Sequence, residues 1–411
     1  MKENYLIPIV HFDERIMAKG EGSFVYDTKG NKYLDLNSGQ FCTIFGHANK
    51  ELTDQICKTM NQLSHTASNI LSEPVIECVK NLNRISGEMN AYSILLSTGA
   101  EAVEFCIRYA KHIKGKNGIV CYDKGYHGLT LGAQSLTYSG QFAMPRVEEI
   151  YPIKIPDTFI TEELLDCHIE ELDKLLKEQN SHIAAVLMEP IISVGGMIIP
   201  PKKWYKKVRQ LCDEYDVLLI FDESQTGFGR LGKWFAYQHF DVVPDMVAIA
   251  KGLGQGYPVS GVLFNEKIIP RQGFSMTHYS SHQNDAFAAN IINIGIEYIE
   301  RNNLLSKVIE LGEYFKSKLL LLQEKNKIVC KARGCGLMLG LDLYFDGAKN
   351  YREIYKHLSG KMTDKGVIIQ GTNAGMTLRF LPDYLISKQN IDLAINTLDD
   401  VLKTEEWEKY I

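Results

Sequence analysis

The chain lacks the signatures of a disulfide-rich, zinc-binding or membrane-spanning protein. Its nine cysteines are scattered, their number is odd, and no two of them stand in a C-x-x-C pair. We therefore expect neither a disulfide framework nor a zinc site, and a reducing cytoplasm is the simplest setting for these thiols. No apolar run reaches the roughly 18 residues of a membrane helix, and the N-terminal segment MKENYLIPIVHFDERIMAKGEG has the pattern of neither a signal peptide nor a membrane anchor.

An excess of positive charge, internal repeats and low-complexity segments are also missing. The chain carries 45 Lys and Arg against 50 Asp and Glu, a net charge of -5. This balance gives no electrostatic reason to expect nucleic acid or an anionic membrane as a partner. The content of 45% hydrophobic and 23% charged residues is typical of a soluble globular protein, and 411 residues suffice for two or three domains.

Short apolar runs alternate with amphipathic stretches between about residues 50 and 300. The runs that predict strands are Ser93–Leu96, Ile119–Tyr122, Ala184–Met188, Val217–Phe221 and Met246–Ala250. They are continuous rather than alternating, as in strands that are covered on both faces. Stretches 100–113 and 203–215 predict helices, so we expect an α/β domain with a mostly parallel sheet.

The two ends of the chain have a different character. Val25–Leu36 predicts a hairpin around a turn that contains Gly30. Beyond about residue 300 we expect a smaller α+β domain. Its predicted elements are helices at 286–300, 305–324 and 350–364, a strand-like segment VCKARGCGLMLGLDLYF, strands near Val367 and Leu378, and a final helix from about Lys388. The expected units are an N-terminal segment with the hairpin that packs with the small domain, a large domain and a small C-terminal domain, at 1–49, 50–304 and 305–411.

Two of the predicted strands end in residues that can do chemistry. The segment VLLIFDESQTGFGRLG closes one strand with Asp222 and Glu223, and DMVAIAKGLGQG closes another with Lys251. Ligands of open α/β sheets bind at the carboxyl ends of the strands. The plainer interpretation is that each residue marks the exit of a strand to solvent. A lysine between a buried strand and a glycine-rich turn, however, has its pKa lowered by desolvation, which makes it a nucleophile for a carbonyl group.

A glycine pattern in the same segment imitates a dinucleotide-binding site. Gly227, Gly229 and Gly232 match G-x-G-x-x-G. In a nicotinamide-binding site such glycines directly follow a strand and open a helix. Here five residues separate the strand from Gly227, and no clear helix follows, so we do not predict a nicotinamide cofactor.

Two further segments contain residues that are suited to bind an anion and to contact the ring of a ligand. In YSILLSTGAEAVEF a turn of small residues joins a strand to an amphipathic helix, so Gly99 and Ala100 stand at a helix N-terminus that favours phosphate. An ordinary N-cap by Ser97 or Thr98 is the simpler alternative. In CYDKGYHGLT, Tyr126 follows another strand, where its ring either lies on a ligand or fills the core.

The order of these motifs resembles that of the class III aminotransferases, which are pyridoxal 5′-phosphate (PLP) enzymes of fold type I. The matching motifs are STGAEA, YHG, EP…GG, DESQTGFGRLGKWFA and PD…AKGLGQGYP, and the resemblance covers about residues 20 to 385. It implies an α/β fold in which a large domain with a mostly parallel central sheet carries a smaller α+β domain. It also implies ping-pong transfer of an amino group from an amino acid or amine to a keto acid or aldehyde.

The resemblance assigns the residues around the cofactor ring. Lys251 would carry PLP as a Schiff base and would move the proton from the substrate. Asp222 would pair with the pyridine nitrogen and keep it protonated. Gln225 would hydrogen-bond the phenolic oxygen of the ring, and Tyr126 would stack on the ring.

The same resemblance assigns the residues around the cofactor phosphate. Gly99 and Ala100 would donate backbone N–H groups to it. In the family a hydroxyl from the neighbouring subunit also binds the phosphate, and Ser281 holds that position here, with Ser280 as the one-residue alternative. The active form would therefore be at least a homodimer.

Two positions are implied to bind the substrate. Arg379, in MTLRFLPDYLI, stands where the family binds a substrate carboxylate, and its planar guanidinium suits that group. Many members that act on ω-amines gate this arginine with a glutamate, but Val194 occupies the position here, so Arg379 would be available at all times. Gln40 stands where the 2,2-dialkylglycine decarboxylase branch places a hydrogen-bonding residue. The motifs NSGQ, EPIISVGG and LSEP resemble that branch only in part, because Val194 replaces a serine and Tyr126 a tryptophan.

The same residues leave three reactions open. Plain transamination requires only Lys251, Asp222 and Arg379. A decarboxylation-dependent transaminase would break the bond from Cα to the carboxylate with help from Gln40. An amino-acid racemase or aminomutase would differ only in its product. The expected partners are a small-molecule amino donor and a keto or aldehyde acceptor, without a metal.

Overall fold

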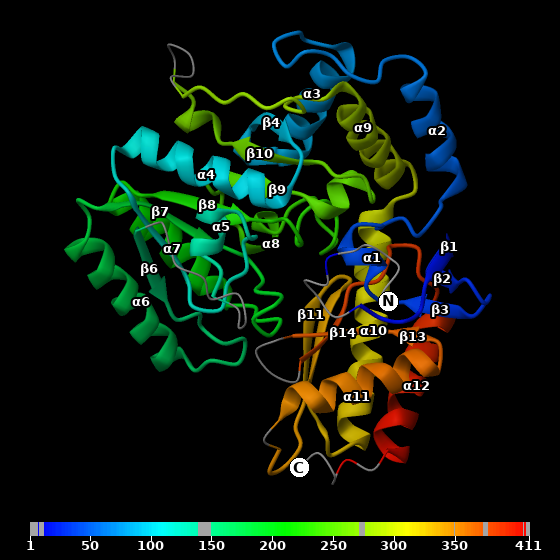
Figure 1. Cartoon of the computed structure of the whole chain (residues 1–411). Helices are drawn as coiled ribbons and strands as arrows, with labels where there is room; N and C mark the ends of the chain where they lie inside the picture. The colour runs from blue at the N-terminus through cyan, green and yellow to red at the C-terminus, as the bar shows by residue number, and fades with distance from the viewer. Residues whose placement is uncertain are drawn as a thin grey trace.

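The computed structural model describes residue 7 and residues 12–138, 149–270, 276–348, 350–372, 377–405 and 407. Within them the chain forms one sheet of seven strands and two sheets of four strands. Figure 1 shows the seven-stranded sheet with its helices in one part of the molecule and the two smaller sheets with the C-terminal helices in another. No helix of the described residues is long and apolar enough to cross a membrane.

The large sheet confirms the prediction of a mostly parallel α/β sheet. Its strands, in spatial order, are β4 (Tyr92–Leu96), β10 (Ser260–Phe264), β9 (Met246–Ile249), β8 (Leu218–Asp222), β7 (Ile183–Met188), β5 (Gly118–Tyr122) and β6 (Glu149–Ile153). Only β10 runs antiparallel to its two neighbours. The sequence prediction missed β6 and β10 but located the other five strands to within one residue at each end.

The two faces of this sheet bury separate hydrophobic clusters. Along β8, Leu218 and Ile220 belong to the cluster on one face, whereas Leu219 and Phe221 belong to the cluster on the other. Side chains alternate between the faces of a strand, so a strand covered on both sides must be apolar throughout. This is the physical reason for the continuous apolar runs in the sequence.

The helices of this part pack against the sheet or against one another. They are α2 (Lys50–Met60), α3 (Glu73–Ser86), α4 (Gly99–Lys114), α5 (Leu131–Ser135), α6 (Glu162–Glu178), α7 (Lys202–Glu214), α8 (Tyr237–Phe240) and α9 (Ala286–Arg301). Helix α4 begins at the carboxyl end of β4, and the Thr98 side chain caps it by accepting from Glu101 N at 3.2 Å. Its buried face contains Val103 and Ile107, as the 3,4 spacing predicts.

The N-terminal hairpin joins a sheet with the C-terminal part of the chain. Strands β1 (Met17–Glu21), β2 (Phe24–Asp27) and β3 (Lys32–Asp35) form antiparallel pairs, which confirms the predicted hairpin. Strand β3 also pairs in parallel with β13 (Val367–Ile368). Figure 1 shows the blue N-terminal strands beside β13 accordingly.

The other small sheet contains β11 (Val329–Cys335), β12 (Met338–Leu343), β15 (Thr377–Phe380) and β14 (Gln370–Gly371). The segment VCKARGCGLMLGLDLYF is thus two strands and not one, because the chain reverses at Gly336, whose φ of 52° suits a residue without Cβ. The short helix α1 (Ser38–Phe41) and the long helices α10 (Leu304–Lys325), α11 (Tyr351–Asp364) and α12 (Lys388–Thr404) complete the described α-helices.

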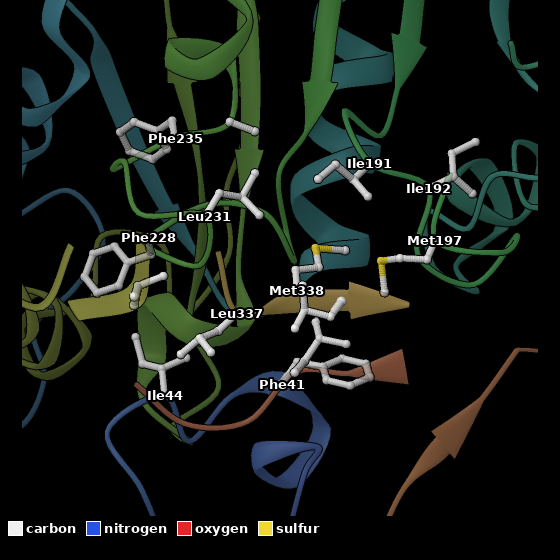
Figure 2. Close-up of a cluster of buried hydrophobic side chains, with 14 of the residues drawn as sticks. Phe41, Ile44, Ile191, Ile192, Met197, Phe228, Leu231, Phe235, Leu337 and Met338 are labelled. Carbon is white, nitrogen blue, oxygen red and sulfur yellow. The ribbon is translucent and has the colours of Figure 1, made fainter. Parts of the chain in front are cut away.

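A hydrophobic cluster joins segments that are far apart in the sequence. Figure 2 shows its side chains pointing toward one another from the N-terminal segment, the loop after β7, the loop after β8 and the β11–β12 turn. The labelled members are Phe41, Ile44, Ile191, Ile192, Met197, Phe228, Leu231, Phe235, Leu337 and Met338, and all are buried. The loops at the carboxyl ends of β7 and β8 are therefore fixed against the rest of the molecule by a packed apolar interface.

Candidate active site

A large cavity opens at the carboxyl ends of the parallel strands. It has a volume of about 800 Å³, and Ser97, Tyr126, Glu189 and Asp222, which line it, stand at or just beyond the ends of β4, β5, β7 and β8. Eight of the nine predicted site residues line this cavity. They are Gln40, Gly99, Ala100, Tyr126, Asp222, Gln225, Lys251 and Arg379.

Asp222 is held in its ionised form by its neighbours. Its carboxylate lies 2.8 Å from Nδ1 of His127 and accepts from the Ser224 hydroxyl at 2.6 Å. Burial acts to raise the pKa of Asp222, but the hydrogen bond and charge of His127, the Ser224 hydroxyl and the Lys251 ammonium outweigh it and hold the pKa below its usual value. A buried carboxylate of this kind is suited to pair with a cationic ring nitrogen.

Lys251 follows β9 directly and has an unusual backbone. Its φ of +49° lies in the left-handed region, which a residue with a Cβ rarely adopts. Burial lowers the pKa of its ammonium group, although the nearby carboxylates of Asp222 and Glu189 act in the other direction. The geometry therefore presents an amine with weakened proton affinity on the cavity wall.

The start of α4 forms the part of the cavity that is suited to bind a phosphate group. The N–H groups of Gly99 and Ala100 lie in its first turn, where backbone donors have no acceptor within the helix. A Cβ on Gly99 would come within 3.2 Å of both Ala250 Cβ and Ser224 Oγ, and a Cβ on Gly128 would come within 2.6 Å of Ala100 Cβ. The two glycines thus allow three loops to converge on this helix end.

The sequence interpretation missed two polar residues of the site. His127 was placed in a motif but was given no role, and Glu189 was not singled out. Glu189 accepts from the backbone N of Tyr126 at 2.8 Å and from the backbone N of Ser193 at 3.4 Å, so it ties the loop after β5 to the loop after β7. Its burial raises its pKa to about 7, although the charge of His127 acts to lower it. Their positions after strands were the available signal, but their partners come from other loops.

Arg379 lies on β15 and is held by neutral groups. It donates from Nη1 to the Ser193 hydroxyl at 3.0 Å and from Nη2 to Oε1 of Gln370 at 2.6 Å. Its guanidinium lies 5.2 Å from the centre of the Phe41 ring. Burial lowers its pKa to about 10. Because Val194 carries no charge, it offers no carboxylate to this arginine, and Glu189, which begins the loop after β7, acts on Arg379 as a nearby negative charge that acts to raise its pKa.

Three other features of the sequence do not contribute to this cavity: Ser281, Glu223 and the glycine pattern. Ser281 is exposed and does not line the cavity of its own chain. Glu223 does not line the cavity either, because its carboxylate accepts from the backbone N of Ala236 and Tyr237. The Gly227 to Gly232 segment forms turns, and the next helix, α8, begins only at Tyr237, so the geometry of a dinucleotide-binding turn is not present there.

Comparison with known proteins identifies the family and the fold. The family model for class III aminotransferases matches residues 10–402. The acetylornithine aminotransferase of Methanocaldococcus jannaschii is 34% identical over 392 residues, which cover 94% of this chain and 93% of that protein. A LysW-aminoadipate semialdehyde/glutamate semialdehyde transaminase of Sulfolobus acidocaldarius is 31% identical, over 95% of each protein.

Solved structures agree with this match. A Bacillus anthracis aminotransferase superposes with a TM-score of 0.91 at 26% identity, over 98% of this chain and 97% of that one. An amine transaminase from an uncultivated Pseudomonas species, solved in its PLP-bound form, has a TM-score of 0.91 at 22% identity, over 98% of this chain and 99% of that one, and shows the shared fold. The architecture is therefore that of the PLP-dependent enzymes of fold type I.

Within that class the chain belongs to the class III aminotransferases, and it is a PLP-dependent transaminase. The side chains of the cavity also indicate that PLP fits there, independently of the comparisons. Three buried side-chain atoms that line it have no hydrogen-bond partner among the described residues, and they are Nε2 of His127, Oε1 of Gln225 and Nε of Arg379. Such atoms are costly unless a bound group satisfies them.

Proposed function

We propose that this chain holds PLP between the start of α4, the loop after β5 and the ends of β8 and β9. Lys251 Nζ is the point of attachment, because it is a buried amine whose pKa is lowered by desolvation. Gly99 and Ala100 donate their backbone N–H groups to the phosphate. Tyr126 covers one face of the ring, and Gln225 hydrogen-bonds its phenolic oxygen.

Asp222 and Lys251 divide the chemical work. When bound, PLP supplies the electron sink for the bond that breaks at the substrate Cα. Asp222, ionised through its contact with His127, holds a proton on the pyridine nitrogen and so keeps that sink effective. Lys251 Nζ takes the proton from the substrate Cα in the first half-reaction. In the second half-reaction it returns a proton to the Cα of the product. The buried Asp222 carboxylate, hydrogen-bonded to His127 and Ser224 in the same cavity as the buried Lys251 amine, is the single observation that carries this proposal.

Arg379 and Gln40 bind the substrate in this proposal. The guanidinium of Arg379 receives the carboxylate, since its hydrogen-bond partners Ser193 and Gln370 are neutral. Gln40 lies on the same cavity wall. Its neighbours Ser38, Gly39 and Phe41 all have positive φ values, between 42° and 68°, so the short helix α1 is distorted next to the cavity.

We further propose a homodimer in which Ser281 of each subunit reaches the phosphate of its neighbour's cofactor. The exposure of Ser281 and its absence from the cavity wall of its own chain support this arrangement. The units 1–49, 50–304 and 305–411 are proposed as the structural divisions, supported by the pairing of β3 with β13. Nine free cysteines support a cytoplasmic location.

The test of this function is direct. Purified protein loaded with PLP should be yellow, and borohydride reduction should fix the mass of the pyridoxyl group on Lys251. Alanine or another amino acid should then convert the cofactor to its aminated form, which a keto acid reverses. Label on another lysine, or no conversion with any amino donor, would refute the proposal.

A further inference from the structure

The charges on the cavity wall restrict the substrates that it can take. Among the described residues that line the cavity, Lys251 and Arg379 are the only lysine and arginine. In the function proposed above, on which this inference rests, the cofactor occupies Lys251. One permanent cation, Arg379, is then left for the substrate. A carboxylate that enters a desolvated site without a cation is strongly disfavoured.

Arg379 has no carboxylate among its hydrogen-bond partners in the described part of the chain, and Glu189 acts on it only as a nearby charge. Its two hydrogen-bond partners, Ser193 and Gln370, are neutral, and its Nε atom is buried without a partner among the described residues. Arg333, on strand β11 of the same sheet, shows the contrast, because it forms an ion pair with Asp342. A buried guanidinium that lacks a carboxylate in the free protein leaves room for one carboxylate of a ligand.

Apart from Lys251 and Arg379, the described residues of the wall offer no cationic lysine or arginine for a second carboxylate. Phe41, Ile191 and Val194 line the cavity near the residues that hold Arg379, and Leu129 lines it from the loop after β5. The acidic groups Asp222 and Glu189 also lie on the wall and would repel a further anion. The segment 276–285, which contains Ser281 and which we propose approaches the neighbouring site, carries no lysine or arginine.

We propose that this transaminase uses monocarboxylic substrates with small or apolar side chains in both half-reactions, as in the pair alanine and pyruvate, and discriminates against dicarboxylates such as glutamate and 2-oxoglutarate. A monocarboxylate satisfies Arg379 and places its side chain against apolar groups. A dicarboxylate leaves its second carboxylate unpaired. The loss expected for an unpaired buried charge corresponds to roughly 100-fold or more in kcat/KM.

The first measurement compares unreactive acids with the PLP-loaded enzyme. Propionate and glutarate differ by one carboxylate, and neither can donate an amino group. Calorimetric titration should give a dissociation constant at least about 100-fold weaker for glutarate than for propionate. Equal or tighter binding of glutarate would overturn the inference without touching the proposed function.

The second measurement compares kcat/KM for alanine with that for glutamate, and for pyruvate with that for 2-oxoglutarate. The monocarboxylate should lead in each pair. Faster turnover of glutamate would overturn the inference while leaving transamination by this site intact. No turnover of any amino donor would instead refute the proposed function.

A pair of variants tests whether the free charge of Arg379 is the cause. Val194→Glu adds a carboxylate to the loop that holds Arg379, and Val194→Gln adds similar bulk without charge. Propionate should bind at least about 10-fold more weakly to Val194→Glu than to Val194→Gln, because the added carboxylate competes for the guanidinium. Equal binding by the two variants would show that Arg379 is not the group that binds the propionate carboxylate.

Discussion

At the scale of single residues, neighbours in the sequence have opposite surroundings. Asp222 faces the cavity and is held ionised by His127, whereas Glu223 accepts two backbone N–H groups away from it. Burial raises the pKa of Glu223 to about 7, while the partners of Asp222 hold its pKa low. The difference in pKa arises from the groups that surround each carboxylate and not from the chemistry of the carboxyl group itself.

Removing the charge of Asp222 should damage turnover more than binding. Asp222→Asn keeps the shape of the side chain but cannot hold a proton on a ring nitrogen, so we expect kcat to fall by about 100-fold or more. Cofactor binding, followed by absorbance during dialysis, should weaken much less. Asp222→Glu serves as the control and should recover part of the activity, because it restores the charge. Unchanged turnover in Asp222→Asn would remove Asp222 from the mechanism.

Arg379 should act on carboxylate substrates alone. In Arg379→Gln, kcat/KM for amino acids should fall by roughly 100-fold, because a charge-assisted contact with the substrate is lost. A simple amine without a carboxylate should keep its kcat/KM to within about threefold. Arg379→Lys, which retains the charge without the planar fork, should lie between the two. Equal losses for amines and amino acids in Arg379→Gln would contradict the carboxylate assignment.

At the scale of elements, the loop after β7 depends on an arginine outside the cavity. Arg333 on β11 donates to the backbone carbonyls of Gly196 and Met197 in this loop, with the Met197 contact at 2.8 Å. Its guanidinium also pairs with Asp342, which accepts from Thr377 Oγ1 at 2.5 Å. Thr377 begins β15, the strand that carries Arg379. Arg333 is thus a positioning residue that ties the loop to the strand.

Loss of Arg333 should loosen the substrate carboxylate site. Arg333→Met should raise KM for amino acids several-fold with little change in kcat for simple amines. It should also lower the free energy of unfolding by about 2 kcal/mol or more, because Asp342 is left unpaired. In the double variant with Asp342→Leu, stability should recover but KM should stay raised, since the two carbonyls still lack their donor. Recovery of both would show that Arg333 has a structural role only.

At the scale of the whole molecule, the proposed dimer places residues of two chains at one site. Ser281→Ala alone should weaken PLP binding by roughly 10-fold, the effect of one lost hydrogen bond to a charged group. In a mixed dimer of Ser281→Ala and Lys251→Ala chains, one site keeps both residues intact if Ser281 acts across the interface. Such dimers should recover about half of the wild-type rate, since a symmetric dimer has two equivalent sites.

Two controls decide this test. Homodimers of Lys251→Ala should be inactive, and homodimers of Ser281→Ala should need more PLP. A mixed dimer that needs as much PLP as the Ser281→Ala homodimer would place Ser281 within its own chain's site. A fully active monomer in the ultracentrifuge would contradict the dimer itself.

The sequence alone determined the nature of the sheet and the chemistry at its edge. Continuous apolar runs revealed β5, β7, β8 and β9 because both faces of these strands are buried. A strand that is buried on both faces needs an apolar residue at nearly every position. Asp222 and Lys251 drew attention because each closes a predicted strand, and the order of the surrounding motifs, which resembles that of a known family, gave them their expected roles. Both signals depend on residues that are adjacent in the chain, so they can be recognised in the sequence.

Only the tertiary structure decided which groups act on each other. The contacts of His127 with Asp222, of Glu189 with Tyr126 and of Arg379 with Ser193 join residues that are 63 to 186 positions apart. The β10 strand was missed because its short segment SGVLF becomes a strand through pairing with β4 and β9. Charge state and strand pairing depend on what the fold brings near, and no local pattern of residues encodes those distant neighbours.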